Sequence, residues 1–99
     1  MCEFKIIKKN DGSQILEDIV ILSYNEDSEL LFKDVIGMGE ILESALILDV
    51  NTLNQTCVVL EHPLIRSFID IIQKVNNKTI SKSEIESFEK QLDDLKKTL

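Results

Sequence analysis

The hydrophobic pattern of the chain changes its period at one point, and this change limits the folds available to it. Up to Leu60, apolar residues mostly alternate with polar ones or form short runs between turn residues, as in β-strands. After Pro63 they recur every three or four residues, as in amphipathic helices. Proline favours an extended residue before it, here His62, and suits the first turn of a following helix. We therefore expect a β-domain over residues 1–62 and a helical appendage over residues 63–99.

The β-domain is expected to contain six short strands. The first alternates, with Cys2, Phe4 and Ile6 on one face, and the others cover about 14–24, 29–36, 40–42, 46–50 and 55–60. Glu17-Asp18 interrupts the second strand and predicts a bend or bulge there. Short strands joined by tight turns favour a small antiparallel SH3-like barrel, whose closure removes exposed edges. A helix over 41–50 is the alternative for that stretch.

Two helices are expected after His62-Pro63. The first covers about 63–75 and has an apolar stripe at helical spacing. Ser81 and Glu84 have the spacing of a capping box, which starts the second helix. The second helix has a narrow apolar seam formed by Ile85, Phe88, Leu92, Leu95 and Leu99. This seam is expected to pack on the first helix, giving an αα-hairpin, or on another subunit.

The charge of the chain is unevenly distributed and argues against nucleic acid as a partner. Residues 1–62 hold four Lys or Arg and twelve Asp or Glu, whereas residues 63–99 hold seven and six. Affinity for nucleic acid depends on Lys and Arg that neutralise phosphates, so the β-domain is expected to repel it. The chain also has no Trp and few aromatic residues on which bases stack. An acidic domain instead suits a cation or a basic partner.

Cysteine content and hydropathy indicate a cytoplasmic protein. Cys2 and Cys57 are too few for a disulfide framework and fit a reducing compartment. No apolar run approaches the ~18 residues of a membrane span, and no signal-peptide pattern opens the sequence. The chain also lacks a glycine-rich phosphate loop and any evident catalytic constellation, so an enzyme is not expected. Cys57 lies in an apolar strand and is expected to pack in the core.

Cys2 directly follows Met1, a position where cysteine can supply two donors to a metal. A small second residue usually allows removal of the methionine, which would leave a thiolate and a free α-amine on Cys2. With the adjacent deprotonated backbone amide, these donors favour square-planar nickel(II) or copper(II). Cys2 is therefore the candidate metal ligand. The alternative is a small hydrophobic residue at the start of a strand.

His62 is the only histidine, so one chain cannot form a site with several histidines. The first and last strands of small barrels often pair, and an antiparallel pair would bring Cys2 close to Glu61 and His62. A thiolate and an imidazole together suit a metal ion. His62 is thus a candidate ligand, or a residue that supports the ligand. The alternative is a histidine that only caps the helix or faces solvent.

Several segments of the β-domain, in order, resemble one family of small proteins. These segments are Met1 to Ile7, Asp11-Gly12, Glu17 to Val20, Lys33 to Gly37 and Leu46 to Val50. Together they resemble the CooT family of small nickel-binding proteins, a group formerly regarded as predicted RNA-binding proteins. The resemblance covers about residues 1–61. It implies a small barrel, a homodimer, and one nickel(II) held between subunits through Cys2 of each chain.

The expected function is therefore that of a homodimeric nickel-binding accessory protein, a metal carrier or metallochaperone that acts on a client metalloenzyme. One alternative is a protein-interaction adaptor that binds no metal, suggested by the helical seam and the acidic β-domain. RNA binding is a further alternative, which the charge and the scarcity of aromatic residues oppose.

Overall fold

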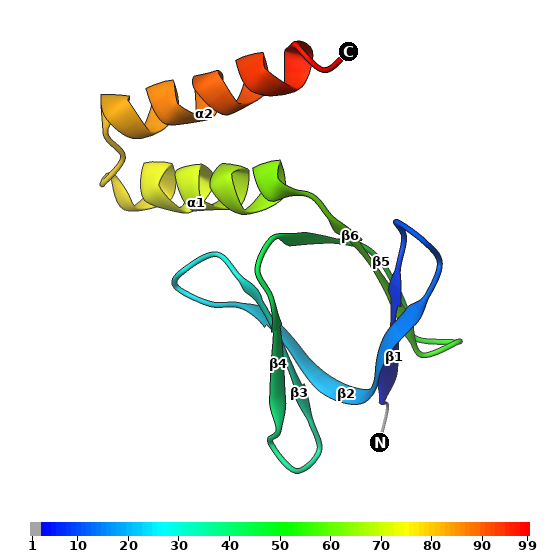
Figure 1. Ribbon diagram of the computed structural model, residues 1–99. Helices are drawn as coiled ribbons and strands as arrows, with labels where there is room; N and C mark the ends of the chain where they lie inside the picture. The colour runs from blue at the N-terminus through cyan, green and yellow to red at the C-terminus, as the bar shows by residue number, and fades with distance from the viewer. Residues whose placement is uncertain (1–2) are drawn as a thin grey trace.

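The computed structural model describes residues 3–99, which form six β-strands followed by two α-helices (Figure 1). The strands are β1 (Phe4–Lys8), β2 (Gln14–Tyr24), β3 (Leu30–Asp34), β4 (Gly39–Leu42), β5 (Ala45–Asn51) and β6 (Thr56–Glu61). The helices are α1 (Pro63–Asn77) and α2 (Lys82–Lys96). The predicted mainly β fold with two C-terminal helices is confirmed. The alternative helix over 41–50 is wrong, because this stretch forms β4 and β5.

The six strands form one curved sheet in the order β4-β3-β2-β1-β6-β5. Within the described residues, β4 and β5 are the two edges and are not hydrogen-bonded to each other. The sheet is therefore open, and the closed SH3-like barrel that the sequence predicted is not confirmed. Figure 1 shows how strongly the sheet curls between these edges.

The first and last strands do pair, but the predicted antiparallel orientation is wrong. β1 and β6 are parallel, with Lys5 opposite Thr56 and Lys8 opposite Val59. The cause is the link between β4 and β5, which consists only of Glu43 and Ser44. This link lacks the Gly or Asn that a two-residue hairpin needs, and the chain keeps its direction instead of reversing. The two strands after it are consequently inverted relative to a simple meander.

The opening of the sheet is bridged by the side chain of Tyr24, at the end of β2. Its hydroxyl donates a hydrogen bond to the carbonyl of Ala45 at 2.7 Å and accepts one from the amide of Ile47 at 3.3 Å. Both backbone groups belong to β5, which has a strand neighbour only on its other side. A single phenol thus satisfies part of an edge that would otherwise have no partner.

The core lies inside the curve of the sheet and takes alternate residues from its strands, as the pleat of a strand requires. Its buried members are Ile6, Ile19, Leu30, Phe32, Ala45, Cys57 and Val59. The predicted irregularity at Glu17-Asp18 is confirmed, because Phe4 lies opposite Ile19 while Ile6 lies opposite Leu16. The bulge, with Asp18 at a φ of 59°, allows Ile19 to point into the core.

The two helices form an antiparallel hairpin at one end of the molecule, with α1 between α2 and the sheet (Figure 1). The rings of Phe68 and Phe88 contact each other, with centroids 6.2 Å apart. The predicted capping box of Ser81 and Glu84 is present. No residue of either helix is buried, so the hairpin adds little to the core. Within residues 3–99, neither helix has the length and apolar composition needed to cross a membrane.

Candidate metal centre

The candidate ligand Cys2 lies outside the described residues, so the site can be built only from its surroundings. β1 begins two residues later, at Phe4, which lies opposite Ile19 of β2. Ile19 in turn lies opposite Asp34, the last residue of β3. On the other side of β1, the amide of Lys5 donates to the carbonyl of Gln55 at 2.9 Å. The start of β1 is therefore flanked by β2 and by the end of the β5–β6 turn, and β3 lies beyond β2.

This end of the sheet lies opposite the helical hairpin, as Figure 1 shows from the start of β1 and the turn between β3 and β4. Its polar side chains serve mainly to close turns. One carboxylate oxygen of Asp34 accepts hydrogen bonds from the amides of Ile36 at 3.1 Å and Met38 at 2.9 Å. The side-chain oxygen of Asn51 similarly accepts from the amides of Leu53 and Asn54. These oxygens stabilise the β3–β4 and β5–β6 turns.

Within residues 3–99, no group of three or more His, Cys, Asp and Glu side chains is arranged to hold a metal ion. Among the same residues, every buried side-chain nitrogen or oxygen has a hydrogen-bond partner. The described surroundings thus offer no ready-made cage for a hard cation.

His62 lies at the other end of the β1–β6 pair. Because the two strands are parallel, the start of β1 is next to Thr56, whereas His62 follows the last residue of β6. The length of β6 separates Thr56 from His62, roughly 20 Å at about 3.3 Å per residue. The predicted proximity of His62 to Cys2 of the same chain depended on an antiparallel pair, and that pairing is wrong.

The structure gives His62 another role, as the N-cap of α1. Its Nδ1 atom accepts a hydrogen bond from the amide of Leu64 at 3.1 Å. An accepting Nδ1 carries no proton, so the proton of the neutral ring is on Nε2. A metal-bound histidine usually donates a hydrogen bond from its other ring nitrogen. Binding a metal through Nε2 would therefore oppose this cap.

The backbone around His62 is also held in place by several contacts. The amide of His62 donates to the carbonyl of Ser44 at 3.2 Å, and the hydroxyl of Ser44 donates back to the carbonyl of His62. The side chain of Asn10 bonds both the amide and the carbonyl of Glu61, at 2.9 and 3.0 Å. The carboxylate of Glu61 hydrogen-bonds Lys8, which raises the pKa of that ammonium. This junction fixes where α1 leaves the sheet.

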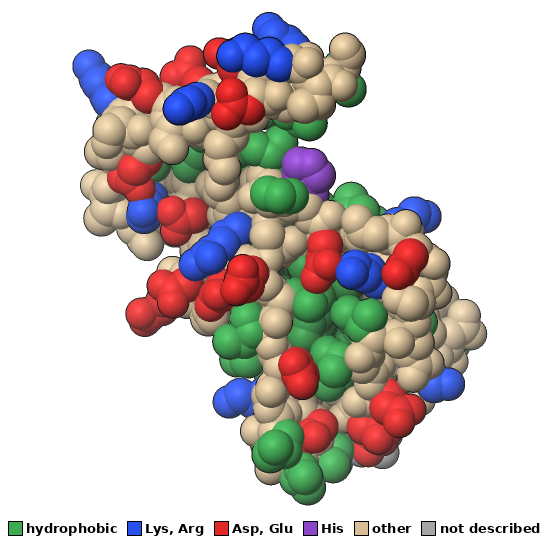
Figure 2. Space-filling model, viewed as in Figure 1, with side chains coloured by type: hydrophobic (Ala, Val, Ile, Leu, Met, Phe, Trp, Pro, Cys, Tyr) green, Lys and Arg blue, Asp and Glu red, His purple; other side chains and the backbone are tan. Residues whose placement is uncertain are grey.

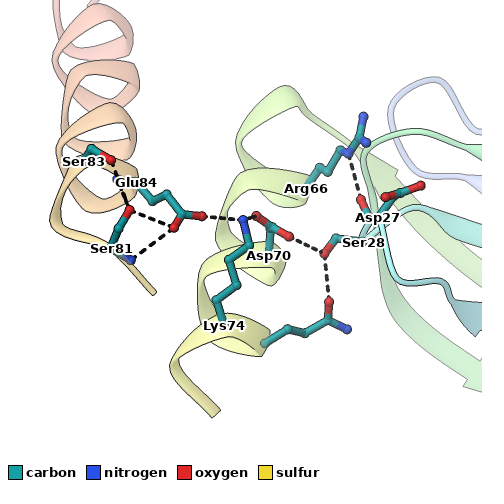
Figure 3. Close-up of polar contacts among 9 residues, drawn as sticks. Asp27, Ser28, Arg66, Asp70, Lys74, Ser81, Ser83 and Glu84 are labelled. Carbon is teal, nitrogen blue, oxygen red and sulfur yellow. Dashed lines mark hydrogen bonds and ion pairs between the residues drawn. The ribbon is translucent and has the colours of Figure 1, made fainter. Parts of the chain in front are cut away.

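A polar cluster between the sheet and α1 was not predicted from the sequence (Figure 3). Ser28 is fully buried, and its hydroxyl donates to Gln73 Oε1 at 2.9 Å, with Asp70 Oδ1 3.4 Å away. Nε of Arg66 donates to the carbonyl of Asp27 at 2.9 Å. These contacts attach α1 to the turn between β2 and β3. No local pattern reveals them, because the partners are 39 to 45 residues apart in the chain.

Two open grooves flank this cluster. One, of about 560 Å³, is lined by Tyr24, Asn25, Glu26, Gln73, Asn76 and Asn77. The other, of about 540 Å³, is lined by Glu26, Asp27, Arg66, Ser67, Asp70 and Lys74. Both are polar, and the second mixes charges of both signs. Ligand pockets are mostly apolar and enclosing, so these grooves are typical of a hydrated seam between two elements.

Cys57 is a second thiol that the sequence had assigned to the core, and this prediction is confirmed. Its side chain is fully buried among apolar residues, and burial raises the pKa of the thiol above its ordinary value of 9.0. A buried protonated thiol is a poor metal ligand, because metals bind the thiolate. Cys2 is therefore the only cysteine of this chain with the chemistry of a candidate ligand.

Comparison with known proteins assigns the chain to no family. No protein-family model matches it, and no curated protein matches it. The case for a metal centre therefore depends on the sequence segments described above and on where they lie in the fold.

Proposed function

We propose that this chain is a homodimeric nickel-binding accessory protein, a metal carrier or maturation factor, that binds nickel(II) through Cys2 of each subunit. The observation that carries the proposal is the arrangement of the segments that resemble the CooT family. Although dispersed in sequence, four of the five reach the end of the sheet where β1 begins.

The strand register supports this convergence. The segment from Met1 to Ile7 includes most of β1, whose Phe4 lies opposite Ile19 in the segment from Glu17 to Val20. Ile19 lies opposite Asp34, which belongs to the matched segment from Lys33 to Gly37. On the other side of β1, Lys5 pairs with Thr56, which in turn pairs with Asn51. The matched segment on β5 ends at Val50, the residue before Asn51. A site at the N-terminus would use residues that surround it in this way.

The donor chemistry gives the proposal its pH dependence. A thiolate, an α-amine and an amide nitrogen must each lose a proton before they bind a metal, so affinity should weaken as pH falls. The set favours square-planar ions, and copper(II) would bind more tightly than nickel(II) by the Irving–Williams order. Selectivity would therefore depend on which metal is available in the compartment, which we propose is the cytoplasm.

We also propose that the sheet is a variant of the SH3-like barrel, opened between β4 and β5. Its two edge strands are consecutive in the chain and joined by two residues, so they must meet at one end. The hydroxyl of Tyr24 supplies hydrogen bonds to β5 where a neighbouring strand of a closed barrel would. The result is a rigid support that holds the N-terminal strand by both of its sides.

The client metalloenzyme is proposed to dock beside the same end of the sheet. The β3–β4 turn exposes Val35, Ile36 and Met38, of which Ile36 is 80% exposed. Figure 2 shows hydrophobic side chains at this tip, on the side of the molecule away from the helices. Contiguous apolar surface of this kind is typical of protein contacts. The same tip is the observation that favours the second candidate function, an adaptor that binds a protein and no metal.

Titration of metal-free protein with nickel, followed by calorimetry and native mass spectrometry, tests the proposal. With Met1 removed, about one nickel should bind per two chains, and Cys2→Ser should abolish binding. Cys57→Ser and His62→Ala are the matched controls and should leave nickel affinity unchanged. An adaptor would instead bind no nickel and would lose its protein partner on Ile36→Asp. Nickel bound equally well by Cys2→Ser would refute the proposed site.

A further inference from the structure

The helical hairpin exposes an apolar face that its own chain does not cover. Both helices are 15 residues long, and neither contains a buried residue. Six large apolar side chains along the hairpin are between 37 and 53% exposed: Phe68, Ile72, Val75, Ile85, Leu92 and Leu95. Figure 2 shows apolar side chains in the space between the two helices, next to His62. Of the seam on α2, only Phe88 is half-buried, against Phe68 of α1.

We propose that this face, which we call the hairpin face, pairs with the hairpin face of a second copy of the chain, so that two hairpins form a four-helix bundle. Two amphipathic helices in water are marginal without further packing, since most helix stability in proteins comes from burial of the apolar stripe. A second hairpin supplies that burial with the same pattern, as a two-fold interface requires.

The size of the hairpin face matches what a stable dimer needs. A large apolar side chain exposes roughly 180 Å² when free, so the six residues expose about 500 Å² in total. Leu99 is 96% exposed and adds about 170 Å² if it joins the interface. A standard interface covers about 800 Å² per partner, of which roughly 65% is apolar in homodimers, or about 500 Å². One hairpin face therefore supplies the apolar area of a standard homodimer interface.

The charge distribution also favours a second copy at this face. Residues 63–99 carry seven Lys or Arg and six Asp or Glu, whereas residues 1–62 carry four and twelve. Two chains thus repel each other least where their hairpins meet. Residues 82–89 contain three Glu and one Lys, and residues 90–97 contain three Lys and two Asp. An antiparallel pair of α2 helices would place these oppositely charged halves beside each other.

The chain's own sheet cannot cover the hairpin face, because α1 lies between α2 and the sheet and is fixed there (Figure 1). The amide of Arg66 donates to the hydroxyl of Ser44 at 2.9 Å, and Ser28 holds the next turns of α1. Lys74 bonds both Asp70 of its own helix and Glu84 of α2, which sets the angle between the helices (Figure 3). The hairpin is consequently held away from the sheet with its apolar residues accessible.

This inference does not depend on nickel, because the hairpin face and the start of β1 lie at opposite ends of the molecule (Figure 1). A nickel held by Cys2 of two chains would therefore join chains of different hairpin dimers. The test consequently separates this inference from the proposed function. Full-length protein, treated with EDTA, is examined by sedimentation equilibrium and by light scattering after gel filtration. We expect the mass of two chains. Leu92→Glu and Ile72→Glu should each weaken dimerisation at least ~100-fold, because a carboxylate would be buried without a partner. Leu53→Glu is the matched control, since Leu53 is 93% exposed on the β5–β6 turn, and it should leave the dimer intact.

Circular dichroism of each variant verifies that the helices remain folded, which is expected because the substituted positions are half-exposed. A metal-free chain that is monomeric would overturn the inference, as would a dimer that persists in both Leu92→Glu and Ile72→Glu. If dimers form only after nickel is added, the hairpin interface is refuted and the proposed function stands. If a metal-free dimer binds no nickel, the proposed function is refuted and the hairpin interface stands.

Discussion

Tyr24 offers the sharpest test of how the open sheet is held together. Tyr24→Phe removes one oxygen atom and leaves the ring in place. The Ala45 carbonyl then loses its donor, and the Ile47 amide loses its acceptor. Ala45 is 1% exposed, so water reaches its carbonyl poorly. Each hydrogen bond contributes about 0.5–1.5 kcal/mol, and a buried carbonyl left without a donor adds to the loss. The substitution should therefore lower the free energy of unfolding by about 2 kcal/mol.

Urea unfolding of the wild type and the variant measures this difference. For a chain of this length, 2 kcal/mol corresponds to a decrease in Tm of roughly 10 °C. Ser23→Ala is the control, because Ser23 is exposed and its hydroxyl has only a 3.5 Å contact with the carbonyl of Tyr24. Hydrogen exchange should accelerate at the amide of Ile47. A Tyr24→Phe protein within about 0.5 kcal/mol of the wild type would show that the phenol does not bridge the opening.

The ionisation of Tyr24 should also make the stability of the protein depend on pH in the alkaline range. Burial raises the pKa of Tyr24 above its ordinary value of 10.0, so the folded protein retains the phenolic proton longer than the unfolded chain. The unfolded state releases this proton first, and the stability of the wild type should decrease as pH rises above 10.0. The difference in the free energy of unfolding between the wild type and Tyr24→Phe should therefore decrease in this pH range. A difference that stays constant well above that pH would contradict this assignment.

Three further predictions concern the hairpin and the core. Lys78 ends α1 with a φ of 60°, a left-handed conformation that strains most residues other than glycine. Lys78→Gly should therefore raise the free energy of unfolding in urea by about 0.5–1 kcal/mol. A less stable variant would show that Lys78 is not strained. The hydrogen bond from Lys74 lowers the pKa of Glu84 below its ordinary value of 4.5. The Glu84 carboxylate therefore stabilises the fold above pH 4.5, and this stabilisation is lost as the pH falls below 4.5. The difference in Tm between wild type and Glu84→Gln, which keeps the capping box, should accordingly vanish in acid; a difference independent of pH would argue against the ion pair. In a Cys2→Ser background, the buried Cys57 should react with a thiol reagent only as fast as the protein unfolds, and immediate reaction would place it outside the core.

Local signals predicted most of the elements. Apolar periodicity located the strands and both helices, because each has one face turned to the core or to a neighbouring helix. The capping box at Ser81 and the bulge at Glu17-Asp18 were also readable, since they depend on residues close together in sequence. The hydrogen bond that makes His62 the cap of α1 joins residues two positions apart. Features of this kind require no knowledge of the tertiary fold.

The errors arose where distant segments meet. The direction of β6 depends on whether Glu43-Ser44 reverses the chain, and a two-residue link without a turn signature leaves that question to tertiary packing. Because the direction of β6 was predicted wrongly, His62 was expected near the start of β1, whereas it lies at the other end of the sheet. The buried hydroxyl of Ser28 could not be predicted either, because its partners on α1 lie more than 40 residues away.

The most direct test of the proposed nickel site is the native mass of the metal-free protein and of the same protein after addition of nickel(II). The measurement reports removal of Met1, the number of nickel ions and the number of chains together. We predict chains that begin at Cys2 and pair through their hairpins before nickel is added, and a gain of one nickel per two chains that Cys2→Ser abolishes. A trimmed chain with Cys2 free that gains no nickel would contradict the proposed function.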